Sequence, residues 1–216
     1  MSYAVLDLEF NQSFNFNDGN EYMPNPKCRF EIIQIGAVKL DNNFNITNEL
    51  EITIKPQIYK RLHPIVEKIT GLEQKDFKRK KTFPIAYEKL LKFLHKDDIL
   101  CFWGPGDIKA LYRNIIFYNL PHYNIQPRFI NIQRAAGKFL EHPASTAIGL
   151  ENAITTLGIN TNLPFHNALN DAKYTAFVLQ AMKNIELEII DFDLGQLEKN
   201  ETIINSSSKD EQLKKN

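Results

Sequence analysis

Two acidic residues stand near the end of a short hydrophobic segment at the start of the chain. Residues 3–10 read YAVLDLEF, which has the length and composition of a buried β-strand and contains Asp7 and Glu9. Side chains two residues apart on a strand leave the same face, so both carboxylates can converge on one ion. Taken alone, the D-x-E pattern is common by chance, and a strand with a solvated polar face explains it better.

A third acid, Asp107, follows the hydrophobic segment 99–103 and the turn Gly104-Pro105-Gly106. Apolar residues recur at helical spacing beyond this turn, which predicts a helix that begins near Asp107. Asp107 would then lie at the junction between a strand and a helix, where a carboxylate can join a site at the end of the strand. The alternative is a structural role, because aspartate is a preferred N-cap residue.

The last pair of candidate residues is His166 and Asp171. Five residues apart on a continuous helix, their side chains would point about 140° away from each other. We therefore expect His166 in the loop after Pro164, Asn167 at the helix N-cap and Asp171 in the first turn, so that both side chains lean toward one cleft. A surface histidine beside an acid that favours the helix dipole is the alternative.

Together these pieces resemble the DEDDh exonuclease superfamily in order and spacing. Other segments, EIIQIGAVKL, HPIVEKITGL and the stretch from FINIQRAAGKFL to GLENAITTLGI, are similar to its enhanced-RNAi-type and sporulation-inhibitor-like subgroup. The resemblance covers about residues 3–182, while an Asn-rich insertion at residues 11–29 and the C-terminal tail depart from it. All five signature residues are present, in Asp7-Leu8-Glu9, Trp103-Gly104-Pro105-Gly106-Asp107 and His166-Asn167-Ala168-Leu169-Asn170-Asp171.

Four carboxylates without a Cys or His cluster of zinc spacing favour Mg²⁺ or Mn²⁺ over Zn²⁺. The resemblance implies two such ions, an arrangement that suits in-line displacement at phosphorus. By the family pattern, Asp7 bridges both ions, Glu9 and Asp171 complete one site, and Asp107 holds the second ion. His166 is then the general base, because a neutral imidazole can take a proton from the attacking water at neutral pH.

Two aromatic residues are candidates for substrate binding. The resemblance implies that Phe10, which directly follows the acidic pair, contacts the terminal nucleotide, and its ring could stack on the base. Packing in the core is the alternative for Phe10. Trp103 could serve as a second stacking surface, although a packing role above the turn that aims Asp107 is favoured for it.

The elements that must position these residues predict one α/β domain. Residues 3–10, 30–40 and 46–54 read as strands of a β-meander with a hairpin turn at residues 41–43, and residues 99–103 and 128–132 as two further strands. The resemblance implies a ribonuclease-H-like mixed sheet flanked by helices. Helices are expected at residues 64–69, 83–94, from about 107, and at 132–140, 148–157 and 168–182.

Composition sets the class of protein. The 216 residues carry 26 basic and 26 acidic side chains, so no global positive field can hold a long duplex, and a nucleic acid must be gripped locally. Two cysteines, one in a buried strand, and no basic leader or long apolar stretch favour a soluble cytoplasmic protein without membrane contact. We expect one exonuclease domain at residues 1–190 and a polar, disordered tail at residues 191–216.

These observations predict a metal-dependent 3′–5′ exonuclease that acts on the 3′ ends of single-stranded RNA or DNA and releases nucleoside 5′-monophosphates. The subgroup resemblance slightly favours RNA. The alternative is a regulatory protein, like the sporulation inhibitors, that uses the fold to bind a partner; the intact set of acids argues against it.

Overall fold

A single mixed sheet organises the chain in the computed structural model, which describes residues 2–16, 24–143, 145–182, 185–195 and 197. The spatial order is β3-β2-β1-β4-β5-β6. The first three strands form an antiparallel meander, β4 and β5 run parallel to β1, and β6 is antiparallel to β5. The strands are β1 (Ser2–Asn11), β2 (Glu31–Leu40), β3 (Ile46–Thr53), β4 (Asp98–Phe102), β5 (Arg128–Asn131) and β6 (Ile189–Asp191).

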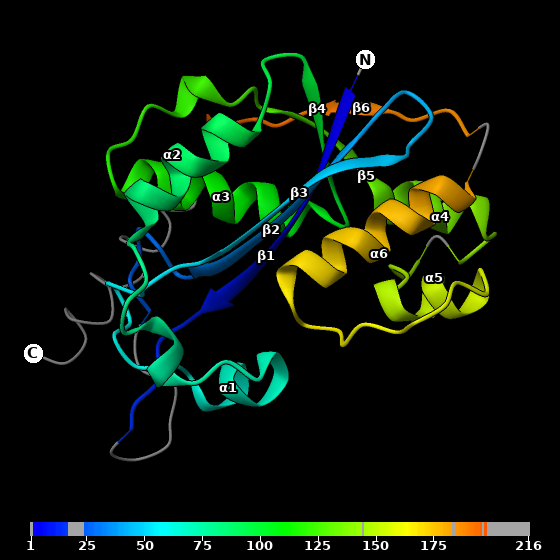
Figure 1. Cartoon of the computed structure of the whole chain (residues 1–216). Coiled ribbons are helices and arrows are strands. Elements are labelled where there is room, and N and C mark those ends of the chain that lie inside the picture. The colour runs from blue at the N-terminus through cyan, green and yellow to red at the C-terminus, as the bar shows by residue number, and fades with distance from the viewer. Residues whose placement is uncertain (1, 17–23, 144, 183–184, 196, 198–216) are drawn as a thin grey trace, which may run out of the picture.

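Helices cover both faces of this sheet (Figure 1). One hydrophobic cluster joins the sheet to α2 and α3, and a second joins it to α4, α5 and α6, while α1 lies beyond one end of the strands. This arrangement confirms the predicted α/β class with a mixed sheet flanked by helices. The helices are α1 (Pro64–Thr70), α2 (Phe83–Phe93), α3 (Pro105–Phe117), α4 (Ile132–Phe139), α5 (Leu150–Thr156) and α6 (Ala168–Ala181).

The hairpin between β2 and β3 follows the predicted turn. The Asp41 carboxylate accepts hydrogen bonds from the backbone N–H groups of Asn43 and Asn45, and Phe44 takes a positive φ of 62°. Aspartate suits this role because its short side chain can satisfy backbone donors two residues ahead. The turn therefore stabilises the meander from which β1 presents its acids.

Alternation along β1 separates its hydrophobic and acidic side chains. Leu6 and Leu8 pack in the cluster with α2 and α3, whereas Val5 packs in the cluster with α4–α6. Since strand residues alternate between faces, Asp7 and Glu9 leave the sheet on the side of Val5, toward α6. A β-bulge between Glu9 and Phe10 ends this regular alternation after the acidic pair.

The structure differs from the sequence prediction at two places. Helix α3 begins at Pro105 with Gly104 as its N-cap, so Asp107 is the third helical residue and not the cap; proline fits the first turn because it has no N–H to leave unpaired. Strand β6 was not predicted, and beyond it Phe192, Leu194 and Leu197 pack against the core. Packed chain thus extends past the predicted boundary at residue 190, and residues 198–216 of the predicted tail lie outside the described residues.

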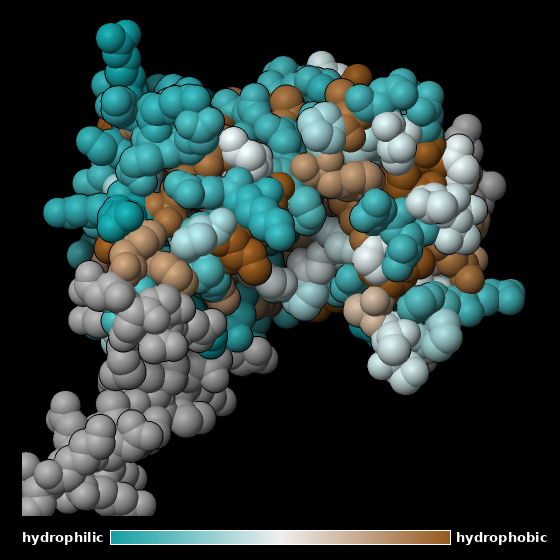
Figure 2. Space-filling model, turned by 90° about the horizontal axis from the view of Figure 1, so that it is seen from below, coloured by the Kyte–Doolittle hydropathy of each residue, from teal (hydrophilic) through white to brown (hydrophobic). Residues whose placement is uncertain are grey.

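The helices show no membrane-spanning feature within the described residues, because each is too short or too polar to cross a membrane. On the face seen in Figure 2, exposed hydrophobic residues are scattered among hydrophilic ones outside the grey region. Isolated apolar residues of this kind are normal on a protein surface.

Candidate active site

Asp7 and Glu9 lie side by side on the face of β1 that is turned toward α6, both half-buried. Across the β1–β2 pair, Asp7 is opposite Gly36 and Glu9 is opposite Gln34. β1 is an inner strand of the sheet, so these acids start from a rigid part of the fold. The prediction that the two carboxylates share one face is therefore confirmed by the backbone geometry.

Asp107 reaches the same region from β4. Strand β4 runs parallel to β1, with Val5 opposite Cys101, so the carboxyl ends of both strands lie at the same edge of the sheet. The chain turns at Gly104 directly into α3 and places Asp107 in the first helical turn. An acid is favourable there because the N-terminal end of a helix carries partial positive charge.

Asp171 comes from the first turn of α6, and His166 from the loop before it, as predicted. Asn167 caps the helix by accepting the N–H of Asn170. His166 has a φ of 61°, and its backbone N–H donates to Oδ2 of Asp171 at 3.0 Å. Its side chain is exposed, whereas the Asp171 side chain is buried.

The loop that carries His166 is held by contacts that the sequence analysis missed. The buried Tyr174 hydroxyl donates to the carbonyl oxygen of Leu163 at 2.7 Å and accepts the Leu163 N–H at 2.9 Å. The Tyr174 ring also stacks on Phe165, with centroids 4.7 Å apart. Asn170 adds a hydrogen bond to the carbonyl oxygen of Pro164. Residues 163–165, directly before His166, are therefore held by side chains of α6.

A second missed group fixes the start of α6 over the sheet. Gln34 is buried and accepts the backbone N–H of Ala168 at 3.0 Å, while its amide donates to Glu51. Glu51 also accepts a hydrogen bond from the Asn167 side chain at 2.8 Å. Gly36, the sheet partner of Asp7, has no side chain, so the first turn of α6 can rest directly on β2. The one sequence signal for these roles was a polar Gln and a Gly inside the run IIQIGAV, whose other residues are hydrophobic.

The four carboxyl groups repel one another in a partly desolvated space. Burial, followed by the charges of Asp107, Asp171 and Glu9, raises the pKa of Asp7 well above its ordinary value. Burial and Asp171 raise the pKa of Glu9 to about 7, and burial and Glu9 raise that of Asp107 to about 8. Burial raises the pKa of Asp171 to about 6, although the backbone N–H and the charge of His166 lower it. Asp7 is the member of this set that is affected by all three others.

This donor set fits a divalent cation. The ligand atoms of Glu9, His166 and Asp171 all lie within 4.8 Å of one another. Oδ1 of Asp171 is buried and has no hydrogen-bond donor, which is costly for a carboxylate unless a cation satisfies it. Oxygen donors of this kind suit Mg²⁺ or Mn²⁺, and a bound cation would favour the ionised form of the four acids, which their mutual repulsion disfavours.

The two predicted substrate-binding aromatics lie in different environments. Phe10 packs partly against the α2–α3 cluster and lines a pocket beside Gly106. Trp103 packs against the α4–α6 cluster, and its indole Nε1 is buried without a partner. Trp103 thus has the packing role that the sequence favoured for it. Phe10 packs against the core and also lines the pocket.

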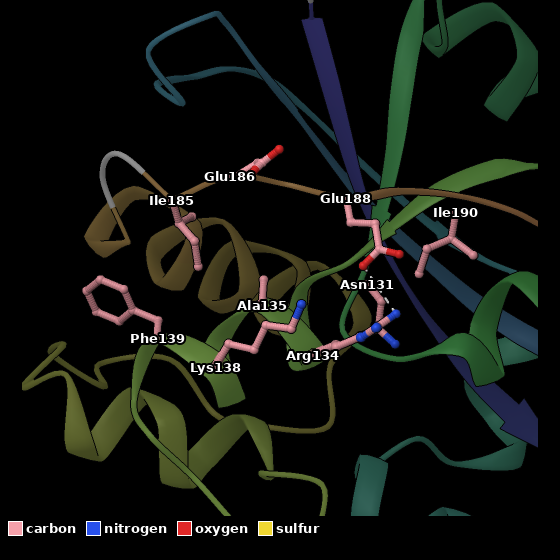
Figure 3. A pocket seen from close by; sticks show the side chains of 9 residues that line it. All are labelled: Asn131, Arg134, Ala135, Lys138, Phe139, Ile185, Glu186, Glu188 and Ile190. Carbon is pink, nitrogen blue, oxygen red and sulfur yellow. Dashed lines mark hydrogen bonds and ion pairs between the residues drawn. The ribbon is translucent and has the colours of Figure 1, made fainter. Parts of the chain in front are cut away.

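Another pocket, of about 460 Å³, lies between α4 and the segment that leads to β6 (Figure 3). Arg134 and Lys138 extend along it, and Arg134 pairs with Glu188 at 3.3 Å. None of its nine lining residues belongs to the acidic group. This pocket is therefore separate from the carboxylate site.

A family model described as Exonuclease (RNase_T) matches residues 5–179, which contain all four acids and His166. A search of curated protein sequences gave no match.

Several solved structures share the fold. The nuclease domain of 3′hExo, described as a DEDDh family member bound to rAMP, has a TM-score of 0.74 and 24% identity over 89% of this chain and 97% of that one. A 3′-exonuclease described in 3′-end recognition of a histone mRNA stem-loop has a TM-score of 0.71 and 20% identity, over 90% and 91% of the two chains. E. coli Exonuclease I with a dT13 oligonucleotide scores 0.63 at 15% identity, covering 85% of this chain but 41% of that one. These similarities confirm the ribonuclease-H-like fold.

Proposed function

The chain belongs to the exonuclease family, and on this premise we propose that it is a metal-dependent 3′–5′ exonuclease acting on single-stranded RNA or DNA. The observation that carries the proposal is the group of four mutually repelling carboxyl groups, with Asp7 at its electrostatic centre and His166 at its exposed rim. The family match gives the class of enzyme; the polarity, substrate and mechanism are our proposal.

Asp7, Glu9, Asp107 and Asp171 would hold two divalent cations. Asp7 is suited to a shared position because all three other acids act on it. The orphaned Oδ1 of Asp171 is suited to direct coordination because burial leaves it without another partner. When bound, the cations supply positive charge that stabilises the charge building up on the phosphate oxygens during in-line displacement.

His166 is the proposed general base. It lies on the solvent side of Asp171 and Glu9, where an attacking water can reach it. Its backbone N–H is engaged by Asp171, so the backbone hydrogen bond orients the residue and leaves the imidazole for proton transfer. A base of this type contributes about 10²- to 10⁴-fold to the rate when it is positioned within hydrogen-bond reach.

Single-stranded ends are the proposed substrate, with RNA slightly favoured over DNA. The chain has no net charge to hold a long duplex, which favours a substrate gripped over few nucleotides. Solved structures of the same fold are described with an RNA stem-loop in one case and with a DNA oligonucleotide in another. These two cases support a fold whose cleft can accept either ribose or deoxyribose, and both RNA and DNA should therefore be tested as substrates.

The direct test uses 5′-labelled RNA and DNA oligonucleotides with Mg²⁺, Mn²⁺ or a chelator. We expect a ladder that shortens from the 3′ end one nucleotide at a time, with nucleoside 5′-monophosphates as products and no reaction in chelator. A circular single strand should stay intact, because the site is proposed to accept a terminus. Cleavage of the circle would show an endonuclease and contradict the proposed polarity.

The alternative of a regulatory protein that only binds a partner receives no support from the described residues. Buried acids that raise one another's pKa destabilise a metal-free fold, and a scaffold would have no use for them. The two functions differ in a simple observable. An exonuclease of this type should gain thermal stability from millimolar Mn²⁺, whereas a scaffold with an unused site should not.

A further inference from the structure

A pocket of about 390 Å³ adjoins the carboxylate site on the α3 side of the sheet. It contains Phe10, the residue after Glu9, and Gly106, the residue before Asp107. Its size lies in the range of about 300–1,000 Å³ that is typical of small-ligand sites. Two of the four acids, Glu9 and Asp107, are therefore chain neighbours of residues that line this pocket.

One wall of the pocket is a single face of α3. Gly106, Lys109, Ala110 and Arg113 line it, at the spacing i, i+3, i+4 and i+7 that places side chains on one side of a helix. Asp107 belongs to the neighbouring face. The same two turns of α3 thus present an acid to the carboxylate group and two cations to the pocket.

The opposite wall is aromatic and cationic. The rings of Phe10 and Phe30 are 6.1 Å apart and tilted by 51°, and Phe30 is 38% exposed. The Arg29 guanidinium lies 5.4 Å from the centre of the Phe30 ring. Aromatic rings beside cations are the combination that proteins use to stack bases and hold the adjoining phosphates.

The three cations have no acidic partner of their own. Within the described residues, Arg29, Lys109 and Arg113 form no ion pair with a carboxylate; the ion pairs there involve other lysines and Arg134. Uncompensated positive charge beside a group of acids would favour an anionic ligand that bridges the two.

The pocket is also built as a rigid unit. Asn114 of α3 is fully buried and donates to the carbonyl oxygens of Phe30 and Ala110, while its own oxygen accepts the N–H of Ile32. This side chain joins the start of β2 to the helix, so the walls keep their separation. A preformed pocket loses little entropy when a ligand binds.

We propose that this pocket binds one nucleotide of the substrate strand that flanks the scissile bond, with its phosphate between Lys109, Arg113 and Arg29. Phe30 would add a second aromatic contact for the base beside Phe10, for which the family resemblance already implies a nucleotide contact. The inference rests on the proposed function, because it assumes a nucleic-acid strand at the carboxylates. Beyond that function, the inference names the residues that would contact the strand on this side of the carboxylate site and so predicts how many phosphate contacts they make.

The test compares two matched pairs of cations. Lys109→Gln with Arg113→Gln removes the pair at this pocket, and Arg134→Gln with Lys138→Gln removes a pair at the same spacing beside the pocket of Figure 3. Binding of a 5′-fluorescent single-stranded 12-mer is measured by anisotropy in chelator, where the strand is not cut, over a range of salt concentrations. Thermal melting of each variant confirms that it is folded.

We expect the Lys109/Arg113 variant to lower the slope of log affinity against log salt by about 1.4, since each phosphate contact contributes about 0.7 with single strands. Phe30→Ala should weaken binding about 10-fold through lost stacking, and Lys109→Glu should weaken it further than Lys109→Gln. The control pair should keep the wild-type slope. If the Lys109/Arg113 variant and the control variant showed the same slope of log affinity against log salt, the inference would be overturned. It would also be overturned if the Lys109/Arg113 variant bound the 12-mer as tightly as the wild type and lost affinity only for a free nucleoside monophosphate.

The two proposals fail in different ways. A wild type that binds the 12-mer through Lys109 and Arg113 but never shortens it with any metal would contradict the exonuclease and leave the pocket assignment standing. If the wild type shortens the strand and the Lys109/Arg113 variant binds it with unchanged affinity, the exonuclease proposal stands and the pocket assignment is overturned.

Discussion

The backbone of Ala168 lies so close to Gly36 that a β-carbon at position 36 would come within 2.0 Å of the Ala168 carbonyl carbon. Gly36 is also the sheet partner of Asp7, and Ala168 is the first residue of α6, three before Asp171. The absence of one side chain thus sets the approach of α6 to β1, and with it the distance between the acids that these two elements carry.

Gly36→Ala should therefore abolish activity and destabilise the fold by about 3 kcal/mol or more, because the new methyl group meets backbone that cannot rotate away. Gly137→Ala is the matched control. Gly137 lies inside α4 with open space at its β-carbon, so alanine there should stabilise the protein by about 0.5–1 kcal/mol. Urea unfolding and a nuclease assay of both variants check this; an active, stable Gly36→Ala protein would show that α6 is not held by this contact.

The Tyr174 hydroxyl supplies a second test of how the loop is positioned. Tyr174→Phe keeps the ring stacked on Phe165 but removes both hydrogen bonds to Leu163, so His166 should lose its fixed position and kcat should fall. Tyr112→Phe removes a buried hydroxyl bonded to Ile125 and serves as control. Both should cost about 1–2 kcal/mol of stability, and only the first should lower kcat. Equal kcat in the two variants would show that the hydroxyl is merely structural.

The raised pKa values make the stability of the metal-free protein depend on pH. Glu9, Asp107 and Asp171 titrate near 7, 8 and 6 in the folded state, against about 4 when unfolded. Between those limits the folded state holds more protons, so its stability is greatest at low pH and falls as pH rises through 6 to 8. In chelator, the melting temperature should decrease from pH 5.5 to 8.5.

Two comparisons isolate the cause of that decrease. Asp107→Asn removes one charge from the group and should flatten the curve near pH 8, and Mn²⁺ should raise the wild-type melting temperature most at pH 8, where the ligands are ionised. A melting temperature in chelator that rises across this range would mean that the acids do not repel one another in the fold.

His166→Asn tests the proposed base with little change to the backbone. Asparagine tolerates the positive φ of 61° at this position better than most residues. We expect kcat to fall about 10²- to 10⁴-fold with KM and metal affinity nearly unchanged, and added imidazole to restore part of the rate. His122→Asn, an exposed histidine on the short 3-10 turn after α3, is the control. A near-wild-type kcat in His166→Asn would assign proton transfer to another group.

The features that could be predicted from sequence are those governed by local pattern. Alternation gave β1–β3 and the shared face of Asp7 and Glu9, and the cap signal at Asn167 placed Asp171 in the first turn of α6. Strand β6 was missed because three residues at a sheet edge leave no periodic signal. The start of α3 was misplaced by two residues because Asp107 competed with Gly104 as a cap.

The supporting residues of the site could not be predicted because their roles exist only after folding. Gln34 and Ala168 are 134 positions apart, and Glu51 and Asn167 are 116 apart, so no local pattern connects them. The pocket beside α3 likewise joins residues from β1, from the segment just before β2 and from α3. Sequence spacing therefore predicted the acids but not the side chains that position them.

The most direct test of the account is Asp7→Asn, which changes one oxygen of the residue on which all three other acids act. With a 5′-labelled oligonucleotide and Mn²⁺, the wild type should give a ladder of products shortened from the 3′ end. The variant should remain folded, melt at a higher temperature than the wild type in chelator at pH 8, gain no stability from Mn²⁺ and give no ladder. An Asp7→Asn protein that still shortens the strand in Mn²⁺ would contradict the carboxylate site as the centre of the reaction.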